Sequence, residues 1–322
     1  MMTSSSIAEI SEQLKISNKV AVFCHIRPDG DALGAGVALT TALQNAGKFA
    51  VMCCDDKIPE KYCFLSGISK INDKLPNDIK FDTFISVDCA DVNRLGAFSN
   101  AFVSFKGRKI NIDHHISNKK FADYNCIAEC PATCEILTEI IICAGFEINK
   151  EIADLLMLGL ITDSGNFTHC DVTAKTFETA ALLRNFGADV NQINYQMFSR
   201  QTKLRAVLFG KVIDNMRFAL DDKLAFVVVG LDLFGKSDTD RSITEGFVDY
   251  PLTIDGVEVS VSLLEVKKRQ YKISLRSKGK VNVNAVAAKF GGGGHILASG
   301  CMLMGELEEV IEKITYAVYQ NL

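Results

Sequence analysis

Short apolar runs that end in aspartate or histidine side chains constrain the fold of this chain more than any other feature. Three of them, Lys19–Cys24, Phe81–Val87 and Lys109–Ile112, are apolar and β-branched and predict strands. Segments with helical periodicity separate them, so we expect an α/β fold with a mainly parallel sheet covered on both faces. Ligands bind beyond the carboxyl ends of such strands, where these polar groups would meet.

The polar groups at these ends are of metal-binding types. They are His25, Asp29 and Asp31 after the first run, Asp88 after the second, Asp113, His114 and His115 after the third, and Asp163 after a helical run, Ile152–Thr162. A buried carboxylate destabilises a fold unless a cation or a hydrogen-bond donor compensates it. Such groups at four ends therefore indicate a shared site for two divalent cations.

The donor atoms indicate which cation would bind. Carboxylate oxygens with a minority of imidazole nitrogens suit Mn²⁺ or Mg²⁺, and the two imidazoles favour Mn²⁺. Asp29 and Asp31, two apart in an extended loop, project to the same side and with His25 can serve two ions. Asp88 is the candidate for a carboxylate shared by ions about 3.5–4 Å apart, with a hydroxide between them as the nucleophile.

Each group also has a simpler structural interpretation. Alone, His25 or Asp163 would be a capping or salt-bridged residue, an Asp-Gly-Asp sequence a turn, and two adjacent histidines a surface pair. The convergence of all of them on one edge of the predicted sheet favours the metal site.

Length and composition predict two domains. A chain of 322 residues, of which 48% are apolar, is long enough to bury two cores. We place a catalytic metal-binding domain at residues 1–190, a helical linker at 191–215 and a smaller α/β substrate-binding domain at 216–322, with the active-site cleft between the two domains.

The second domain is expected to bind anions. Its predicted strands are Leu224–Val229, Val257–Glu265 and Tyr271–Arg276, and its predicted helices are Ser242–Leu252 and Leu307–Tyr319. Between residues 266 and 289 there are eight basic side chains and no acidic one, whereas the carboxylates cluster in the first domain. A solvated basic face is the alternative interpretation of such a run.

Composition also bears on location and on the thiols. No apolar run reaches the roughly 18 residues of a membrane helix, and the N-terminus lacks the pattern of a signal peptide, so we expect a cytoplasmic protein. The 11 cysteines are an odd number without a C-x-x-C motif, which favours reduced, buried thiols. Cys126, Cys130 and Cys134 have helical spacing, but Pro131 interrupts them and no histidine completes a soft metal site.

The ordered motifs HIRPDGDALGAG, VDCAD, DHH and TDSGNF, followed by LRSKG and GGGGHILASG, resemble the DHH phosphoesterase superfamily with its DHH-associated C-terminal domain. Within it the chain is most similar to the bifunctional oligoribonuclease and 3′-phosphoadenosine 5′-phosphate phosphatase group, the nano-RNases. The resemblance covers essentially the whole chain.

The resemblance implies a role for each candidate residue. One Mn²⁺ would be held by His25, Asp29 and Asp88, and the other by Asp31, Asp88, His114 and Asp163. His115 would touch the scissile phosphate, and Asp113 would orient a ligand histidine. The implied substrate-binding residues are Arg276, Ser277, Gly292, Gly293, Gly294 and His295. Arginine can hold a phosphate with two hydrogen bonds, and glycine amides can approach an anion or a base closely.

The implied activity is metal-dependent hydrolysis of short single-stranded RNA to mononucleotides and of 3′-phosphoadenosine 5′-phosphate to AMP. Short substrates would be preferred if a basic wall closes the far end of the cleft. An inorganic pyrophosphatase, a cyclic-dinucleotide or linear dinucleotide phosphodiesterase and a non-catalytic nucleotide sensor are the alternatives. No membrane partner is expected, and a homodimer is left open.

Overall fold

The computed structural model describes residues 4–234 and 241–322, and the chain divides into two compact units, residues 1–200 and 201–322. The predicted linker, residues 191–215, spans this boundary. Its first part contains most of α7 (Val190–Asn194) and a π-helical turn, Tyr195–Ser199, and its second part contains α8 (Lys203–Asp214).

A parallel five-stranded sheet forms the centre of the first unit. The strands lie in the order β2-β1-β3-β4-β5, and every neighbouring pair is parallel. Their bounds are β1 (Lys19–Phe23), β2 (Phe49–Cys53), β3 (Thr83–Val87), β4 (Arg108–Asp113) and β5 (Tyr124–Ile127). The three strands predicted from the sequence are β1, β3 and β4, which lie next to one another. Their carboxyl ends therefore meet at one edge of the sheet.

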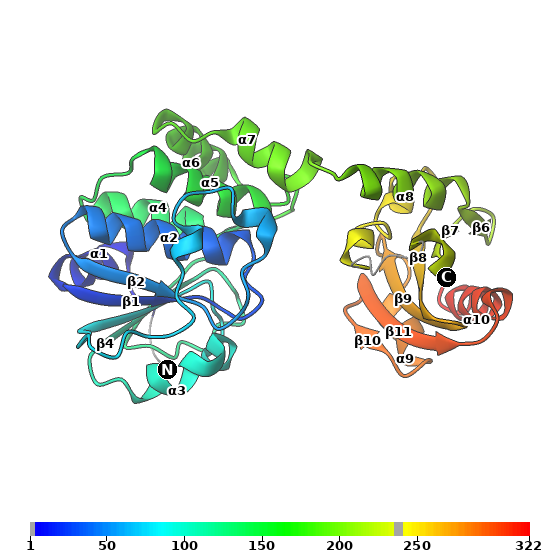
Figure 1. The fold of residues 1–322 in the computed structure, drawn as a ribbon, viewed down its shortest axis with the longest axis horizontal. Coiled ribbons are helices and arrows are strands. Elements are labelled where there is room, and N and C mark those ends of the chain that lie inside the picture. The colour runs from blue at the N-terminus through cyan, green and yellow to red at the C-terminus, as the bar shows by residue number, and fades with distance from the viewer. Residues whose placement is uncertain (1–3, 235–240) are drawn as a thin grey trace. The chain divides into compact units, whose positions relative to one another are not determined.

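Helices cover both faces of this sheet (Figure 1). One face packs against four helices, α1 (Ile7–Ile16), α2 (Gly30–Asn45), α4 (Thr133–Cys143) and α5 (Lys150–Asp163). The other face is apolar and aromatic: Phe23 and Phe84 pack there against Phe98 and against Phe102 of α3 (Ser99–Ser104). A further helix, α6 (Ala174–Asn185), follows α5.

A mixed six-stranded sheet, in the order β10-β11-β9-β8-β7-β6, forms the second unit. Its elements are β6 (Arg217–Ala219), β7 (Leu224–Val229), β8 (Val259–Lys267), β9 (Gln270–Ser277), α9 (Val283–Ala288), β10 (Gly293–Gly294), β11 (Ala298–Met304) and α10 (Leu307–Tyr319). Only β7 and β8 are parallel. One face of the sheet buries apolar side chains against α9 and α10, whereas α8 covers the β7 part of the other face. The α/β fold predicted for both domains is confirmed.

Two local predictions are wrong. Residues 242–252 do not form one helix: short 3₁₀ turns, Arg241–Thr244 and Tyr250–Thr253, flank an irregular segment that contains Gly246 with a positive φ of 82°. Phe247 and Val248 are buried all the same, so the apolar residues of this segment pack without forming a helix. The thiols are not all buried as predicted, because Cys63, Cys143 and Cys170 are exposed, Cys143 at the end of α4. At the end of α4, local apolar content suggested a burial that the packing does not provide.

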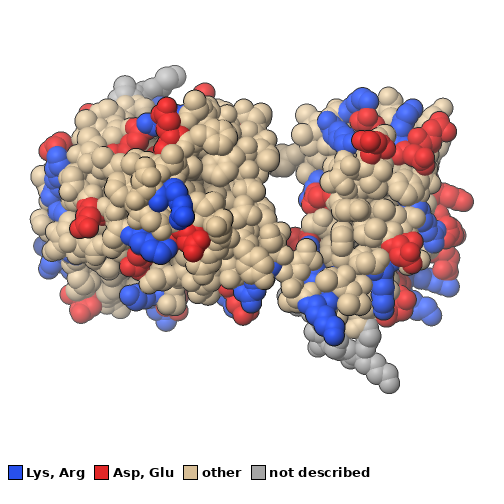
Figure 2. All heavy atoms as spheres, turned by 90° about the horizontal axis from the view of Figure 1, so that it is seen from above, with Lys and Arg blue, Asp and Glu red and all other residues tan. Residues whose placement is uncertain are grey.

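Charges are mixed on the surface of the second unit. In the view of Figure 2 both basic and acidic side chains lie on its surface. Arg269, Arg276 and Lys280 each form an ion pair with an acidic residue from elsewhere in the unit. Among the described residues, no helix has both the length and the apolar character that a membrane span requires.

Candidate metal centre

The carboxyl ends of β1, β3 and β4 bring the predicted metal ligands together. His25 follows β1, Asp88 follows β3, and Asp113 ends β4 just before His114 and His115. This places the possible ligand atoms in three groups, and within each group all atoms lie within 4.8 Å of one another. The groups are His25 with Asp29 and Asp88, Asp31 with His114 and Asp163, and Asp88 with His114 and His115.

Asp88 belongs to two of these groups, and its two oxygens point to different partners. Oδ2 lies 3.3 Å from Nε2 of His25, whereas Oδ1 lies 3.5 Å from Nε2 of His114. The backbone supports this placement, since Asp88 has a positive φ of 52° and its N–H donates to the carbonyl of Ile112. A non-glycine residue in this region is strained and usually persists because its surroundings hold it there.

The segment from Asp29 to Asp31 is not the extended loop that the spacing suggested. Asp29 is the N-cap of α2, and its Oδ1 accepts hydrogen bonds from the N–H groups of Asp31 and Ala32. Its Oδ2 points to His25 Nε2 at 3.5 Å. Asp31 lies in the first turn of α2 and is fully buried. The two carboxylates are therefore separated by a cap and a helical turn rather than aligned along a loop.

Asp163 reaches the site because α2 and α5 pack closely through glycines. A Cβ atom on Gly30 would lie 2.3 Å from Oγ1 of Thr162, and one on Gly159 would lie 2.5 Å from Oδ1 of Asp31. Larger residues would separate the helices. At this spacing, Oδ2 of Asp163, at the end of α5, lies 3.1 Å from Nε2 of His114.

The two candidate ligand histidines, His25 and His114, are held with Nε2 facing the carboxylates. Nδ1 of His25 lies 2.8 Å from the carbonyl oxygen of Ile26, and Nδ1 of His114 lies 2.9 Å from that of Cys130. A carbonyl only accepts, so Nδ1 carries a proton and Nε2 is the nitrogen that a cation would bind in place of a proton.

His115 is oriented differently. Its Nδ1 donates to Oδ1 of Asp113 at 2.7 Å, and Asn118 donates to the other oxygen of Asp113. The hydrogen bond to Asp113 raises the pKa of His115, against the effect of burial. Asp113 thus contacts His115 rather than the candidate ligand His114.

The electrostatics of the cluster fit a cation. Burial and the charges of Asp88 and Asp163 hold the pKa of Asp31 well above its usual value. Burial lowers the pKa of His25, but hydrogen bonds with Asp29 and Asp88 outweigh it and raise this pKa to about 10. Buried carboxylates that repel one another and attract protons in this way are the donors that hard divalent cations bind.

Thr133 is a site residue that the sequence did not reveal. At the start of α4, its main-chain N–H donates to Oδ2 of Asp31 at 2.6 Å and its Oγ1 donates to Oδ1 of Asp88 at 3.1 Å. Cys134 donates its N–H to the other oxygen of Asp31. Cys126 lies on β5 and Cys134 on α4, so the three evenly spaced cysteines do not share a helical face.

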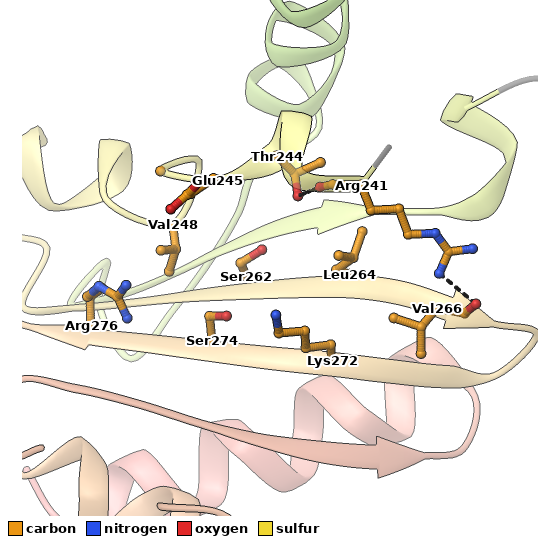
Figure 3. A pocket seen from close by; sticks show the side chains of 11 residues that line it. Arg241, Thr244, Glu245, Val248, Ser262, Leu264, Val266, Lys272, Ser274 and Arg276 are labelled. Carbon is orange, nitrogen blue, oxygen red and sulfur yellow. Dashed lines mark hydrogen bonds between the residues drawn. The ribbon is translucent and has the colours of Figure 1, made fainter. Parts of the chain in front are cut away.

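The predicted substrate-binding residues of the second unit lie on different faces of its sheet. Arg276 lines a pocket of roughly 570 Å³ between β8, β9 and the segment Arg241–Val248 (Figure 3). Ser277, the next residue of β9, points into the apolar core and accepts a hydrogen bond from the N–H of Gly279. The structure therefore does not bring Ser277 into the pocket of Arg276.

The glycine run is partly engaged in backbone pairing. Gly292 donates its N–H to the carbonyl of Ala287, and Gly293 and Gly294 form the short edge strand β10 against β11. A Cβ atom on Gly292 would lie 2.2 Å from the carbonyl oxygen of Gly300, which explains why this position carries glycine. His295 follows β10 and is exposed.

Comparison with known proteins agrees with this architecture. Residues 19–160 match the DHH family, N-terminal domain, and residues 221–320 match the DHHA1 domain. The chain is 29% identical over 97% of its length to the bifunctional oligoribonuclease and PAP phosphatase NrnA of Thermus thermophilus, covering 93% of that protein.

Two further similarities extend the comparison. The cyclic-di-AMP phosphodiesterase GdpP of Geobacillus thermodenitrificans is 25% identical over 97% of this chain and 49% of that protein. The crystal structure of an exopolyphosphatase-related protein from Bacteroides fragilis superposes with a TM-score of 0.82 at 29% identity, covering 98% of this chain and 95% of that one.

Proposed function

Because this chain belongs to the DHH family of phosphoesterases, it is a hydrolase of phosphoester bonds, and we propose that it degrades short oligoribonucleotides to mononucleotides and converts 3′-phosphoadenosine 5′-phosphate to AMP. The relative from Thermus thermophilus, similar over nearly its full length, carries both activities in its name. The first unit would carry the catalytic residues and the second would bind substrate.

The observation that carries the proposal is the position of Asp88 between two sets of ligand atoms. His25 and Asp29 would hold one cation together with Asp88, and Asp31, His114 and Asp163 would hold the other with the same carboxylate. Two cations supply an acidified water as nucleophile and neutralise the charge of the phosphate. We propose Mn²⁺ for both, with Mg²⁺ as the alternative, because imidazole nitrogens take part.

The remaining residues of the site orient the ligands and contact the substrate. Thr133 and Cys134 fix the two oxygens of Asp31 through main-chain N–H groups, so its carboxylate is held in one orientation. His115, with Nδ1 held by Asp113, presents Nε2 to the scissile phosphate and donates a hydrogen bond to it. Its side chain is one-third exposed, as a group that contacts substrate must be.

Arg276 is the proposed substrate contact in the second unit. Its Nε donates to Asp249 and its Nη1 donates to the carbonyl of Leu275, which fixes the guanidinium at the edge of the pocket and leaves Nη2 for a phosphate. Gly292, Gly293, Gly294 and His295 would contact the same nucleotide, whereas Ser277 would act only by supporting the turn after β9.

The experiment that tests the function is a hydrolysis assay over end-labelled oligoribonucleotides of graded length beside 3′-phosphoadenosine 5′-phosphate. We expect turnover of dinucleotides to short oligomers and of the bisphosphate with Mn²⁺, weaker turnover with Mg²⁺ and none with a chelator. Equal turnover of a 20-mer and a dimer would contradict the preference for short substrates. Hydrolysis of pyrophosphate alone would assign the site to a different reaction.

Hydrolysis of a cyclic dinucleotide is the second candidate function. It is favoured by one observation, the similarity of 97% of this chain to part of the cyclic-di-AMP phosphodiesterase GdpP. Adding cyclic di-AMP and its linear form to the same assay separates the two. A higher kcat/KM for the cyclic compound than for the linear dinucleotide would favour the second candidate.

A further inference from the structure

The pocket beside Arg276 extends well beyond that residue along β8 and β9. Figure 3 shows Ser262 and Leu264 of β8, and Ser274 and Lys272 of β9, projecting into the space below the segment that carries Thr244, Glu245 and Val248. Arg241 closes the far end, where its Nη1 donates to the carbonyl of Val266 at 2.6 Å. A pocket of roughly 570 Å³ has room for a nucleotide.

Two hydroxyl groups lie side by side on the floor of this pocket. Ser262 and Ser274 are direct partners in the antiparallel β8–β9 ladder, so their Cβ atoms lie about 5 Å apart on one face. Neither hydroxyl has a hydrogen-bond partner among the residues that the structure describes. Ser260, on the same face of β8, is fully buried and its Oγ also lacks a partner within the described residues. Packing against the apolar neighbours on this face of the sheet does not require a hydroxyl group at any of these three positions.

Lys272 is a cation of the pocket that forms no ion pair with any described residue, although Glu245 also lines this pocket. It lies two residues before Ser274 on β9, on the same face, opposite Leu264. Arg276 is paired with Asp249, and Arg241 is committed to the carbonyl of Val266. In the described part of the chain, no hydrogen bond or ion pair engages the ammonium of Lys272. A charged donor and two hydroxyls therefore face one space without partners.

We propose that Lys272, Ser262 and Ser274 form a binding site for the terminal phosphomonoester of a nucleotide, next to Arg276. A terminal phosphate has three non-bridging oxygens and close to two negative charges at neutral pH, and it can accept hydrogen bonds from all three side chains at once. A phosphodiester has two such oxygens and one charge. Val248, Leu264 and Val266 provide an apolar wall for the rest of the nucleotide.

The inference rests on the proposed function for the identity of the ligand as a substrate or product. It specifies the substrate class: a nucleotide or short oligonucleotide that ends in a free phosphate would bind more tightly than the same molecule that ends in a hydroxyl. The site would thereby select chain ends and mononucleotides over internal phosphodiesters.

Calorimetric titration of the full chain in the presence of a chelator tests the site without turnover. The probes are adenosine 5′-monophosphate and adenosine. We expect the monophosphate to bind the wild-type protein at least tenfold more tightly than adenosine. The substitution Lys272→Met should weaken binding of the monophosphate by roughly tenfold or more, because it removes a charge-assisted hydrogen bond. Ser274→Ala should weaken it by a smaller factor, and neither should change the affinity for adenosine.

Lys268→Met is the matched control, because Lys268 is exposed in the β8–β9 turn and does not line the pocket. It should leave both affinities unchanged within about twofold, a difference of less than 0.5 kcal/mol. Equal binding of the monophosphate by the wild-type and Lys272→Met proteins would overturn the proposal, as would equal binding of monophosphate and adenosine by the wild type.

A kinetic comparison separates this inference from the proposed function. With Mn²⁺, Lys272→Met should raise KM for a dinucleotide with a terminal phosphate and leave KM for its terminal-hydroxyl form unchanged. If the wild-type protein hydrolyses both substrates and Lys272→Met affects neither, the function stands and the site is wrong. If the wild type hydrolyses neither but the monophosphate binds through Lys272, the site stands and the function is wrong.

Discussion

The main-chain N–H of Thr133 donates a hydrogen bond of 2.6 Å to Oδ2 of Asp31, which lies 102 residues earlier in the sequence. This bond joins the first turn of α4 to the first turn of α2. The side chain of Thr133 bonds to Asp88 at the same time. One residue that is not itself a metal ligand therefore orients two proposed ligands.

Thr133→Val should weaken metal binding without unfolding the protein. Valine keeps the shape of threonine and the N–H bond to Asp31, but it removes the hydroxyl that holds Oδ1 of Asp88. Loss of such an orienting group typically costs about 10- to 100-fold in metal affinity or activity. Titration with Mn²⁺ and turnover at saturating metal would measure the two effects.

Thr138→Val is the control for this change. Thr138 is equally buried in α4, and its hydroxyl bonds only to the carbonyl of Cys134 in its own helix. Metal affinity should stay within about threefold of wild type, or roughly 0.7 kcal/mol. A similar loss in both variants would mean that packing of α4, and not the hydroxyl of Thr133, sets the affinity.

Asp88→Ala should remove both cations and nearly all turnover. Oδ2 of Asp88 faces His25 and Oδ1 faces His114, so we expect the loss of both cations and not of one alone. The loss of activity should exceed the roughly 100-fold typical of groups that only orient a ligand. Elemental analysis after dialysis should find fewer than one Mn²⁺ per chain. A near-normal rate after chelation and reconstitution with Mn²⁺ is incompatible with a shared carboxylate.

Gly159→Ala should destabilise the first unit by about 1–3 kcal/mol, as overpacking does in tight cores. The added Cβ would lie 2.3 Å from Sγ of Cys134 and 2.5 Å from Oδ1 of Asp31, so α2 and α5 must separate. Chemical denaturation with a chelator present measures the change in stability. Gly210→Ala is the control, because a Cβ atom added there would have nothing within 4 Å. The higher helix propensity of alanine should increase the free energy of unfolding by about 0.5–1 kcal/mol.

Arg276→Ala should chiefly raise KM, by roughly tenfold, with kcat within about threefold of wild type, because the arginine binds substrate away from the reacting bond. Arg217→Ala provides a matched change, since Arg217 also forms one ion pair, with Glu308, but does not line the pocket. It should leave KM unaltered. A fall in kcat with constant KM for Arg276→Ala would place this residue in the chemical step instead.

Mn²⁺ should raise the melting temperature of the chelator-treated protein. In the cluster of Asp31, Asp88 and Asp163, burial and like charge oppose ionisation of Asp31, and a bound cation relieves both. Binding to the native state adds about 2.7 kcal/mol when the free ion is at 100 times its dissociation constant. Scanning calorimetry with and without Mn²⁺ would detect this, and Asp88→Ala should lose the shift.

The sequence by itself predicts the metal ligands at the strand ends. Parallel strands all end at the same edge of a sheet, so His25, Asp88 and His114 had to lie near one another once β1, β3 and β4 were recognised. Strand alternation likewise could have separated Arg276 from Ser277, since neighbouring residues of a strand face opposite sides. That information was local and was present in the sequence.

Only the tertiary structure revealed the roles of Thr133, Ser262 and Lys272 and the way in which Asp163 reaches His114. These depend on the distance at which α2 and α5 pack, on the position of the first turn of α4, and on the register of β8 against β9. Periodicity in a sequence reports which face of an element is buried. It does not report which other element lies against that face, because that is decided by contacts between residues far apart in the chain.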